Sequence, residues 1–314
     1  MRIRATVAAV SGALALSALA LPTAAQADGA QGSTGSVADV ARAAQSAPAT
    51  DSAAKFGARS VSPASEPGEL DLTFSKVVVN GGKPIVVGTT LTKTVTTTFT
   101  LTHAADVDIF APDFVVDVSL YRGSFDTPTN ELYGDEPPVC KAVSATVATC
   151  KGQISVWPRI DLLGNSDATK WAAGGFAVAF NGEDPADPDP DLTKIGFALQ
   201  EKVGSSSLQR ASKVTVNAAP EPVKKGKTIT VTGKLSRANW EDYQYHGYTA
   251  QPVKLQFLKK GGKAWSTVKT ATTSSLGTLK ATVTASVDGY WRYSFAGTAS
   301  TPATSSTGDF VDVK

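Results

Sequence analysis

An acidic segment near the middle of the chain holds the residues best suited to bind a metal ion. Carboxylates occur in close succession at Glu183, Asp184, Asp187, Asp189 and Asp191. Calcium takes six to eight oxygen ligands, and alternating carboxylates on an extended loop can supply several of them. Prolines separate the acids, and the segment does not follow the EF-hand pattern. Calcium is therefore a candidate cofactor, with Asp184, Asp187, Asp189 and Asp191 as its ligands; the other interpretation of the segment is a stiff, solvated acidic loop.

A second candidate is an aromatic cluster formed by Trp240, Tyr243, Tyr245 and Tyr248. Aromatic side chains on a loop can stack on a sugar ring or form the centre of a protein interface. The alternative is that Trp240 and one or two of the tyrosines cover the hydrophobic core. The other four tryptophans are interpreted as core or strand residues: Trp157, Trp171, Trp265 and Trp291.

Residues for nucleophilic or phosphate chemistry are scarce. The only two histidines, His103 and His246, fall in different predicted domains, so they do not form a metal-binding pair. The chain contains no Gly-x-Ser-x-Gly motif and no phosphate-binding glycine loop. No nucleic-acid recognition motif is present either. A pair of carboxylates, as used by glycosidases, needs no motif and stays open as an alternative.

Cys140 and Cys150 are the only cysteines of the 314-residue chain. An even count in an exported protein predicts a disulfide between them. The intervening residues 141–148 fit either two short strands or one loop.

Alternating apolar residues predict the elements that carry these groups. Period two indicates a strand with one buried face, and turn residues separate successive strands about every ten residues. In the second half the alternating positions are Val214/Val216, Ile229/Val231/Leu235, Val253/Leu255/Phe257, Leu279/Ala281/Val283 and Trp291/Tyr293/Phe295. In the first half they are Leu70/Leu72/Phe74, Val95/Phe99/Leu101, Phe114/Val116/Val118/Leu120, Phe176/Val178/Phe180 and Ile195/Phe197/Leu199. Asn80-Gly81-Gly82 has the chemistry of a hairpin turn.

The predicted fold is all-β, with two immunoglobulin-like antiparallel β-sandwiches in tandem at residues 67–210 and 211–314. Residues 1–27 have the basic start, apolar run and small-x-small end of a signal peptide. Residues 28–66 are rich in Ala, Ser and Gly and are expected to form a disordered linker. We therefore expect a secreted, extracellular protein that does not insert into a membrane after signal cleavage.

The two predicted domains differ in charge. Residues 211–314 carry 14 Lys and Arg and 6 Asp and Glu, which gives a formal charge of +8. Residues 67–210 carry 11 Lys and Arg and 18 Asp and Glu, which gives a formal charge of −7. A basic exported module can attract anionic cell-wall polymer, although surface lysines also keep β-proteins soluble.

The second half of the chain contains residues 212–227 with the strand after them, Arg237-Ala238-Asn239-Trp240, Val253-Lys254-Leu255-Gln256-Phe257 and the segment 289–298. Together these segments resemble a module at the C-terminus of many secreted actinomycete proteins. In that family an N-terminal β-domain of unknown function precedes the module, and residues 77–88 extend the resemblance upstream. Some relatives carry the label calcium-binding protein. The resemblance implies this two-domain architecture and names no reaction.

The sequence thus predicts a secreted, non-enzymatic binding protein whose partner is an extracellular polymer, a glycan or another protein. One alternative is an extracellular hydrolase that uses a carboxylate pair on a β-scaffold. A second alternative is a structural surface or matrix protein.

Overall fold

The computed structural model of the 314-residue chain describes residues 68–90, 92–184 and 191–314. The predicted signal peptide and linker lie outside the described residues, and so do Asp187 and Asp189 of the acidic segment. Strands make up almost all regular structure in the described ranges; the helical segments there are two short 3₁₀ turns, η1 (Asn80–Gly82) and η2 (Asn165–Asp167). The chain is all-β, as the alternating pattern predicts.

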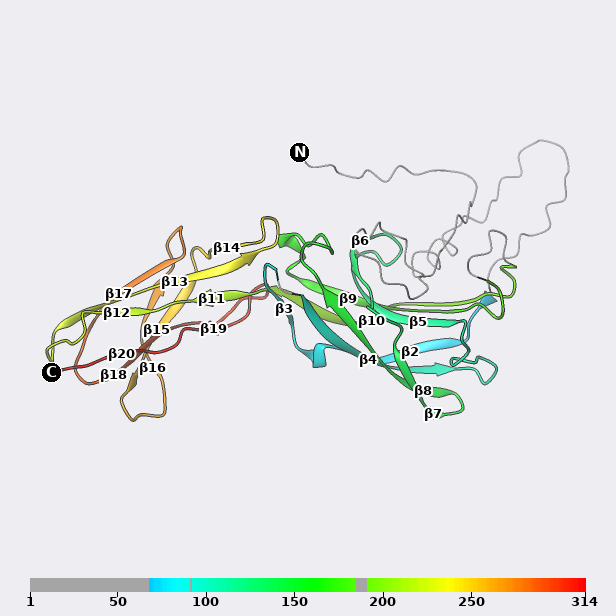
Figure 1. The fold of residues 1–314 in the computed structure, drawn as a ribbon, viewed down its shortest axis with the longest axis horizontal. Helices are drawn as coiled ribbons and strands as arrows, with labels where there is room; N and C mark the ends of the chain where they lie inside the picture. The colour runs from blue at the N-terminus through cyan, green and yellow to red at the C-terminus, as the bar shows by residue number, and fades with distance from the viewer. Residues whose placement is uncertain (1–67, 91, 185–190) are drawn as a thin grey trace, which may run out of the picture. The chain divides into compact units, whose positions relative to one another are not determined.

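The strands of residues 68–210 form two sheets (Figure 1). One has the order β1-β10-β9-β5-β6, with β3 also paired to β10, and the other has the order β2-β4-β8-β7. The bounds are β1 (Gly68–Glu69), β2 (Leu72–Val79), β3 (Ile85–Val87), β4 (Lys93–His103), β5 (Phe114–Gly123), β6 (Pro128–Leu132), β7 (Val139–Ser144), β8 (Val147–Val156), β9 (Lys170–Ala179) and β10 (Gly196–Arg210).

The strands after β10 form two further sheets. In the first, β13 pairs with β11, β12, β14 and β17; in the second, the order is β16-β15-β18-β19, with β20 also paired to β18. The bounds are β11 (Ser212–Val214), β12 (Asn217–Ala219), β13 (Thr228–Asn239), β14 (Gln244–Gly247), β15 (Pro252–Lys259), β16 (Ser266–Thr272), β17 (Thr278–Thr284), β18 (Gly289–Phe295), β19 (Thr304–Ser305) and β20 (Asp309–Val311).

Contacts divide the chain into two compact units. The smaller unit contains the described residues up to 72 together with 103–116 and 176–199, and the larger contains 73–102, 117–175 and 200–314. In the smaller unit Val178, Ile195 and Phe197 form a buried cluster, on which Phe180 and Leu199 pack. The predicted domain boundary between residues 210 and 211 stays a prediction.

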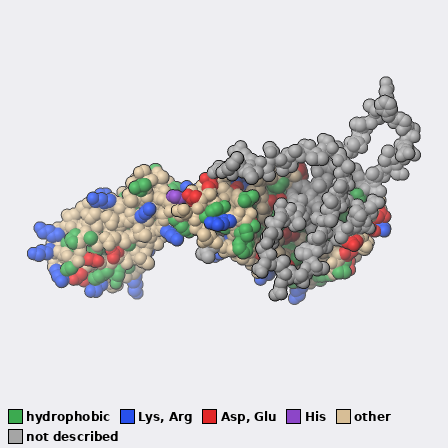
Figure 2. Space-filling model, turned by 45° about the horizontal axis from the view of Figure 1, so that its top comes forward, with side chains coloured by type: hydrophobic (Ala, Val, Ile, Leu, Met, Phe, Trp, Pro, Cys, Tyr) green, Lys and Arg blue, Asp and Glu red, His purple; other side chains and the backbone are tan. Residues whose placement is uncertain are grey.

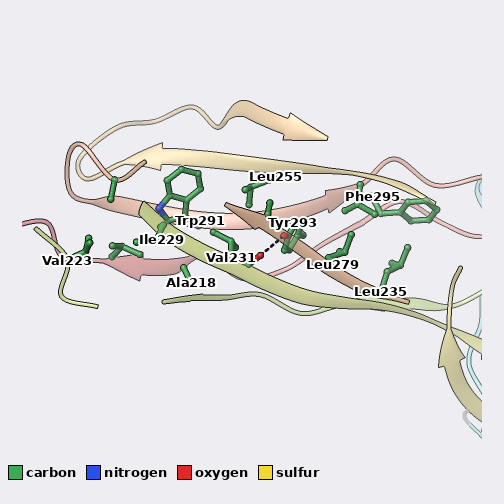
Figure 3. Packing of buried hydrophobic residues seen from close by; sticks show 14 residues of the cluster. Ala218, Val223, Ile229, Val231, Leu235, Leu255, Leu279, Trp291, Tyr293 and Phe295 are labelled. Carbon is green, nitrogen blue, oxygen red and sulfur yellow. Dashed lines mark hydrogen bonds between the residues drawn. The ribbon is translucent and has the colours of Figure 1, made fainter. Parts of the chain in front are cut away.

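The best-defined core in the larger unit lies between the two sheets of the C-terminal strands (Figure 3). Every second residue of β18 is buried there, Trp291, Tyr293 and Phe295, as expected for a strand with one face against the core. The Tyr293 hydroxyl donates a hydrogen bond of 2.8 Å to the Val231 carbonyl oxygen, drawn as a dashed line. Burial raises the pKa of Tyr293 to about 12, so the phenol stays a neutral donor.

Two features depart from the expected antiparallel hairpins. β1 and β3 both pair in parallel with β10. The turn Asn80-Gly81-Gly82 does not close a hairpin, because β2 and β3 belong to different sheets. The three residues have φ angles of 52°, 60° and 76°, in the left-handed region that favours Asn and Gly. The turn chemistry was predicted correctly, and the pairing of the flanking strands was not.

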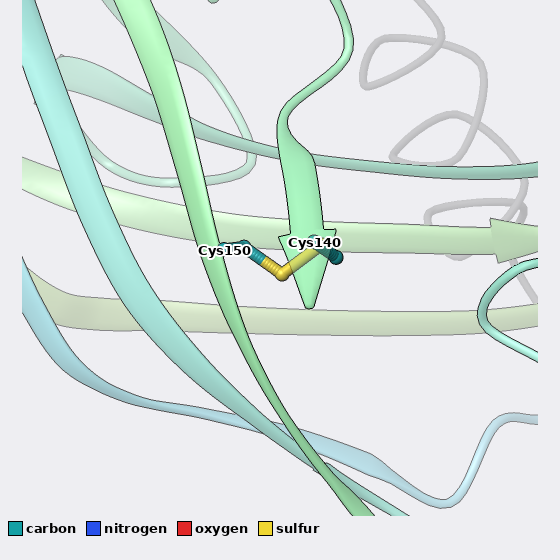
Figure 4. Close-up of a disulfide and its surroundings, with 2 residues drawn as sticks. All are labelled: Cys140 and Cys150. Atoms are coloured by element: carbon teal, nitrogen blue, oxygen red, sulfur yellow. A yellow bond between two sulfur atoms is a disulfide. The ribbon is translucent and has the colours of Figure 1, made fainter. Parts of the chain in front are cut away.

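The predicted disulfide is confirmed. Cys140 in β7 bonds to Cys150 in β8 with an S–S distance of 1.97 Å, and the two residues face each other in the antiparallel register (Figure 4). The intervening residues therefore form two strands and not a single loop. The disulfide fixes β7, the end strand of its sheet, to its neighbour.

Candidate binding surface

The described part of the acidic segment is engaged in local contacts. Lys194 Nζ lies 2.7 Å from Glu183 Oε1 and 3.8 Å from Asp191 Oδ2. The Thr193 hydroxyl donates to Asp191 Oδ1 at 2.5 Å. The hydrogen bond from Lys194 lowers the pKa of Glu183, and the one from Thr193 lowers the pKa of Asp191. The Lys194 ammonium group thus lies against carboxylates of the segment that a calcium ion would need as ligands. Asp184 is described, and its predicted co-ligands Asp187 and Asp189 are not.

Trp240 of the aromatic cluster is fully buried. Its indole N–H donates a hydrogen bond of 2.9 Å to the Gly88 carbonyl oxygen, and its backbone N–H donates to Asn165 Oδ1 at 3.1 Å. Trp240 is therefore inaccessible to a ligand and belongs to the interior, as the alternative interpretation of the sequence expected.

The three tyrosines of the cluster are half-buried, and a cation lies over each ring. The pairs are Arg159 and Tyr243 at 4.5 Å to the ring centroid, Lys213 and Tyr245 at 3.9 Å, and Arg237 and Tyr248 at 3.9 Å. These cation–π contacts take up one face of each ring. The structure does not bring the four aromatic residues together as an open stacking platform.

Catalytic arrangements find little support in the described residues. No three His, Cys, Asp or Glu side chains lie close enough together there to hold a metal ion. His246 Nε2 lies 2.6 Å from Asp242 Oδ2 in an exposed pair, and His103 Nδ1 contacts the Ala104 carbonyl oxygen. A hollow of about 170 Å³ is lined by Gly82, Lys83, Pro84 and Ser205–Ser207, and this lining contains no carboxylate.

Two carboxyl groups have strongly raised pKa values, and both hold backbone in place. Burial raises the pKa of Asp117 to about 6 and that of Asp161 to about 6. Asp117 Oδ2 accepts a hydrogen bond from the Gly134 N–H at 2.8 Å, and Asp161 Oδ2 accepts one from the Trp157 N–H at 2.5 Å. Each carboxylate thus has a structural partner that explains its position.

The most distinctive surface feature is an apolar loop that follows β8, which we call the Trp157 loop (Trp157 to Leu162). Three of its large apolar side chains face solvent: Trp157 is 45% exposed, Ile160 61% and Leu162 81%. Scattered single apolar residues are normal on protein surfaces, whereas three large exposed ones within six residues make this loop a candidate interaction site.

Hydrogen bonds fix the backbone of this loop. The Asp161 N–H donates to the Trp157 carbonyl oxygen at 2.9 Å, while the Trp157 N–H donates to the Asp161 carboxylate, so the two residues bond reciprocally. The Leu163 N–H donates to the Pro158 carbonyl oxygen at 3.1 Å. From β6, Asn130 Nδ2 donates to the Asp161 carbonyl oxygen at 3.2 Å. The loop is therefore held in one conformation.

The residues that follow the loop anchor it to the interior. Leu163 is buried, and η2 follows directly. In η2 Asp167 forms an ion pair with Arg122 and accepts the Gly164 N–H at 2.8 Å, and the buried Trp171 indole donates to the Asp167 carbonyl oxygen at 2.8 Å. These contacts tie the C-terminal end of the loop to the interior.

Leu162 adopts a backbone conformation that leucine rarely takes. Its φ is 49°, in the left-handed region, which costs an ordinary L-residue roughly 1–2 kcal/mol. Tyr243 has a φ of 59°, also in the left-handed region. The guanidinium of Arg159, a residue of the loop, lies over the Tyr243 ring. Strained residues of this kind concentrate at binding and catalytic sites, where the surrounding structure holds them.

The alternating apolar pattern does not predict this loop. Trp157 is expected from the sequence to be a core or strand residue, but it lies just past the end of β8 and faces solvent. A usable signal was present: Trp157, Ile160 and Leu162 do not alternate with period two, and Pro158 interrupts any strand. Trp171 and Trp291 are buried as expected, whereas Trp265 is only half-buried.

No protein-family model and no curated protein matches this sequence. Among solved structures the chain is similar to the mouse nectin-like molecule 4 ectodomain (Ig1–Ig3; 12% identity, TM-score 0.22), the Yersinia pseudotuberculosis adhesin InvE (12%, 0.24) and the Escherichia coli adhesin FdeC (17%, 0.22). The alignments cover 76%, 78% and 77% of this chain and 65%, 60% and 65% of those chains. TM-scores this low leave the function of this chain to be inferred from its own residues.

Proposed function

We propose that this chain is an extracellular, non-enzymatic binding protein that recognises a partner protein through the Trp157 loop. The observation that carries the proposal is the exposure of Trp157, Ile160 and Leu162 on a backbone fixed by hydrogen bonds. Without a binding role, these three side chains would be expected to be buried or to be replaced by polar ones.

The energetics suit a protein–protein contact. Burying a large apolar side chain contributes about 1.5–3 kcal/mol, and a few such residues supply most of the affinity of an interface. A preformed loop loses little conformational freedom on binding, so more of this free energy appears as affinity. Aliphatic side chains such as Ile160 and Leu162 offer no hydrogen bonds to a sugar, which favours a protein with an apolar pocket as the partner.

Export is part of the proposal. The signal-peptide pattern at residues 1–27 and the Cys140–Cys150 disulfide both support an oxidising compartment. In the part of the chain that the structure describes, none of the helical segments has the length and hydropathy needed to span a bilayer.

Calcium is a separate proposal, supported by the carboxylates of the acidic segment at Asp184, Asp187, Asp189 and Asp191. Its binding would compete with Lys194, whose ammonium group already lies against Glu183 and Asp191. The role of the ion would be to order this loop; no catalytic role is proposed.

The test is a capture experiment with matched variants. Wild-type chain, the double variant Ile160→Asp/Leu162→Asp and the control Leu276→Asp are immobilised and exposed to extracellular proteins of the producing species. Leu276 is 71% exposed on the turn between β16 and β17, so its substitution adds one of the two negative charges of the double variant at a similarly exposed leucine elsewhere. We expect specific proteins to be retained by wild type and control and to be lost from the double variant. Retention of the same proteins by all three would contradict the proposal.

A further inference from the structure

A second, chemically different surface lies on the outer face of the sheet β16-β15-β18-β19. Because side chains alternate along a strand, Tyr290 and Arg292 of β18 point away from the core that holds Trp291 and Tyr293. On the neighbouring strand Gln256 lies directly opposite Arg292 in the antiparallel register. This face is distinct from the Trp157 loop.

Arg292 is held in a fixed orientation. Its Nε donates a hydrogen bond of 2.8 Å to Gln256 Oε1, and its guanidinium carbon lies 4.1 Å from the ring centroid of Trp265, just before β16. The remaining guanidinium N–H groups have no hydrogen-bond partner within the described residues. A guanidinium stacked on an aromatic ring and bonded on one edge can present its other edge to an anion.

A pair of aromatic rings lies beside this arginine. Tyr290 of β18 and Phe310 of β20 are directly opposite in the register, with ring centroids 5.1 Å apart. Lys260 Nζ is 5.4 Å from the centroid of Phe310 and 3.3 Å from Asp288 Oδ2. Asp288 also accepts the Val313 N–H at 2.9 Å, so this neighbouring carboxylate is already engaged.

Gly308 joins the two parts of the surface. A Cβ atom at this position would lie 3.1 Å from Trp265 Cη2 and 3.1 Å from Tyr290 Cβ, closer than ordinary van der Waals contact. The exposed Gly308 therefore packs closely against both aromatic residues, and any side chain there would push against Trp265 and Tyr290. Its φ lies outside the left-handed region, so backbone conformation does not explain the glycine. We call Trp265, Tyr290, Arg292, Phe310 and Gly308 the Trp265 face.

The C-terminal strands as a whole carry a net positive charge. Residues 211–314 carry 14 Lys and Arg against 6 Asp and Glu. Figure 2 shows Lys and Arg side chains spread over the visible part of the C-terminal strands, at the left of the view. Such a field attracts polyanions and raises their rate of association.

We propose that the Trp265 face binds an anionic polysaccharide. Arg292 covers one face of Trp265, so Tyr290 and the other face of Trp265 would offer apolar ring surface to the C–H face of a sugar that lies over Gly308. Arg292 receives the carboxylate or sulfate of the same or the adjacent sugar through its outer N–H groups. Charge and flat aromatic surface together select a charged sugar polymer over a purely acidic peptide.

The experiment measures binding of the full chain to four polymers: polygalacturonate, dextran sulfate, neutral dextran and polyglutamate. The first two distinguish carboxylate from sulfate as the anionic group. Three variants accompany the wild type. Gly308→Val places a side chain against Trp265 and Tyr290 without removing a charge, and Trp265→Ala removes the ring. Lys280→Gln on β17 removes a charge from a different sheet and serves as control.

We expect polygalacturonate or dextran sulfate to bind more tightly than neutral dextran and polyglutamate. This affinity should decrease when the salt concentration is raised from about 0.05 M to about 0.3 M. Gly308→Val and Trp265→Ala should each weaken binding at least about tenfold, a change of roughly 1.4 kcal/mol, and Lys280→Gln should have little effect. Equal binding by Gly308→Val and wild type would overturn the proposal, as would equally tight binding of polyglutamate or no binding to either anionic glycan. The Ile160→Asp/Leu162→Asp variant should bind the polysaccharide normally, which separates this proposal from that of the Trp157 loop.

Discussion

The Asp161 carboxylate supports the backbone of the Trp157 loop in the conformation that the structure shows. Its side chain accepts the Trp157 N–H while its own backbone N–H donates back to the Trp157 carbonyl oxygen. Burial raises its pKa to about 6, which shows that the carboxylate is kept in place at a cost in solvation.

Replacing this residue should loosen the loop without unfolding the protein. We expect Asp161→Ala to speed hydrogen exchange at the Trp157 amide and to reduce partner capture, because the amide loses its acceptor. The melting temperature should fall only slightly, since the loop contributes little to the core. Unchanged exchange at this amide would show that other contacts fix the loop.

Asp117 provides a test of stability against pH. Its carboxyl group is nearly buried, and its pKa rises from 3.8 to about 6, mainly through burial. The folded state therefore holds this proton between about pH 4 and pH 6 while the unfolded state has lost it, so the contribution of Asp117 to stability falls as the pH rises through this window.

Asp117→Asn removes this titration and keeps an oxygen that can accept the Gly134 N–H. We expect the variant to gain roughly 1–3 kcal/mol on wild type between pH 4.5 and pH 7.5. Chemical denaturation of both proteins at several pH values measures this difference. A difference that stays constant with pH would mean that Asp117 has an ordinary pKa in the folded protein.

Among the elements, strands with one buried face were predictable and strands exposed on both faces were not. Alternation identified β13, β15, β17 and β18, whose buried positions coincide with the apolar ones. β16 and β7 are exposed along almost their whole length, so burial imposes no pattern on their sequences.

The candidate surfaces were harder to predict than the strands. Trp265 and Trp157 are aromatic residues next to strands, and sequence alone does not tell which side of the sheet they take. The cation over Tyr243 comes from a position far away in the sequence, Arg159. Long-range packing of this kind leaves no local sequence signal.

The disulfide gives a prediction for the hairpin of β7 and β8. The chain-entropy relation assigns roughly 2.5–3 kcal/mol to closing so short a loop. We expect Cys140→Ser/Cys150→Ser to lose about this much unfolding free energy while keeping the all-β circular dichroism spectrum, since the two strands also share ladder hydrogen bonds. Urea denaturation of both proteins checks the value. No loss would show that the reduced hairpin is already fully constrained.

At the scale of the whole molecule, two surfaces of different chemistry suggest two kinds of partner. The Trp157 loop is apolar and rigid, and the Trp265 face is aromatic and cationic. An extracellular protein with both could attach to a polysaccharide while it holds another protein. The two contacts should respond differently to salt, because charge attraction is screened and apolar burial is not.

Calcium is tested on the intact molecule by thermal unfolding. If the acidic segment binds the ion, about 10 mM calcium should raise the melting temperature relative to chelator, because a ligand that binds only the folded state stabilises it. Lys194→Met should enlarge the shift, since it removes the competing ammonium group, and Asp187→Ala/Asp189→Ala should abolish it. The same melting temperature with calcium and with chelator would rule out the site.

Competition at the cell surface decides whether the Trp157 loop is the binding element. Labelled wild-type chain is bound to cells of the producing species at about 0.3 M salt, which suppresses charge-driven attachment. It is then displaced with excess unlabelled protein. We predict that unlabelled wild type and unlabelled Leu276→Asp displace the labelled protein equally. Ile160→Asp/Leu162→Asp, with the same melting temperature as wild type, should displace little of it. Full displacement by the double variant would contradict the assignment of binding to this loop.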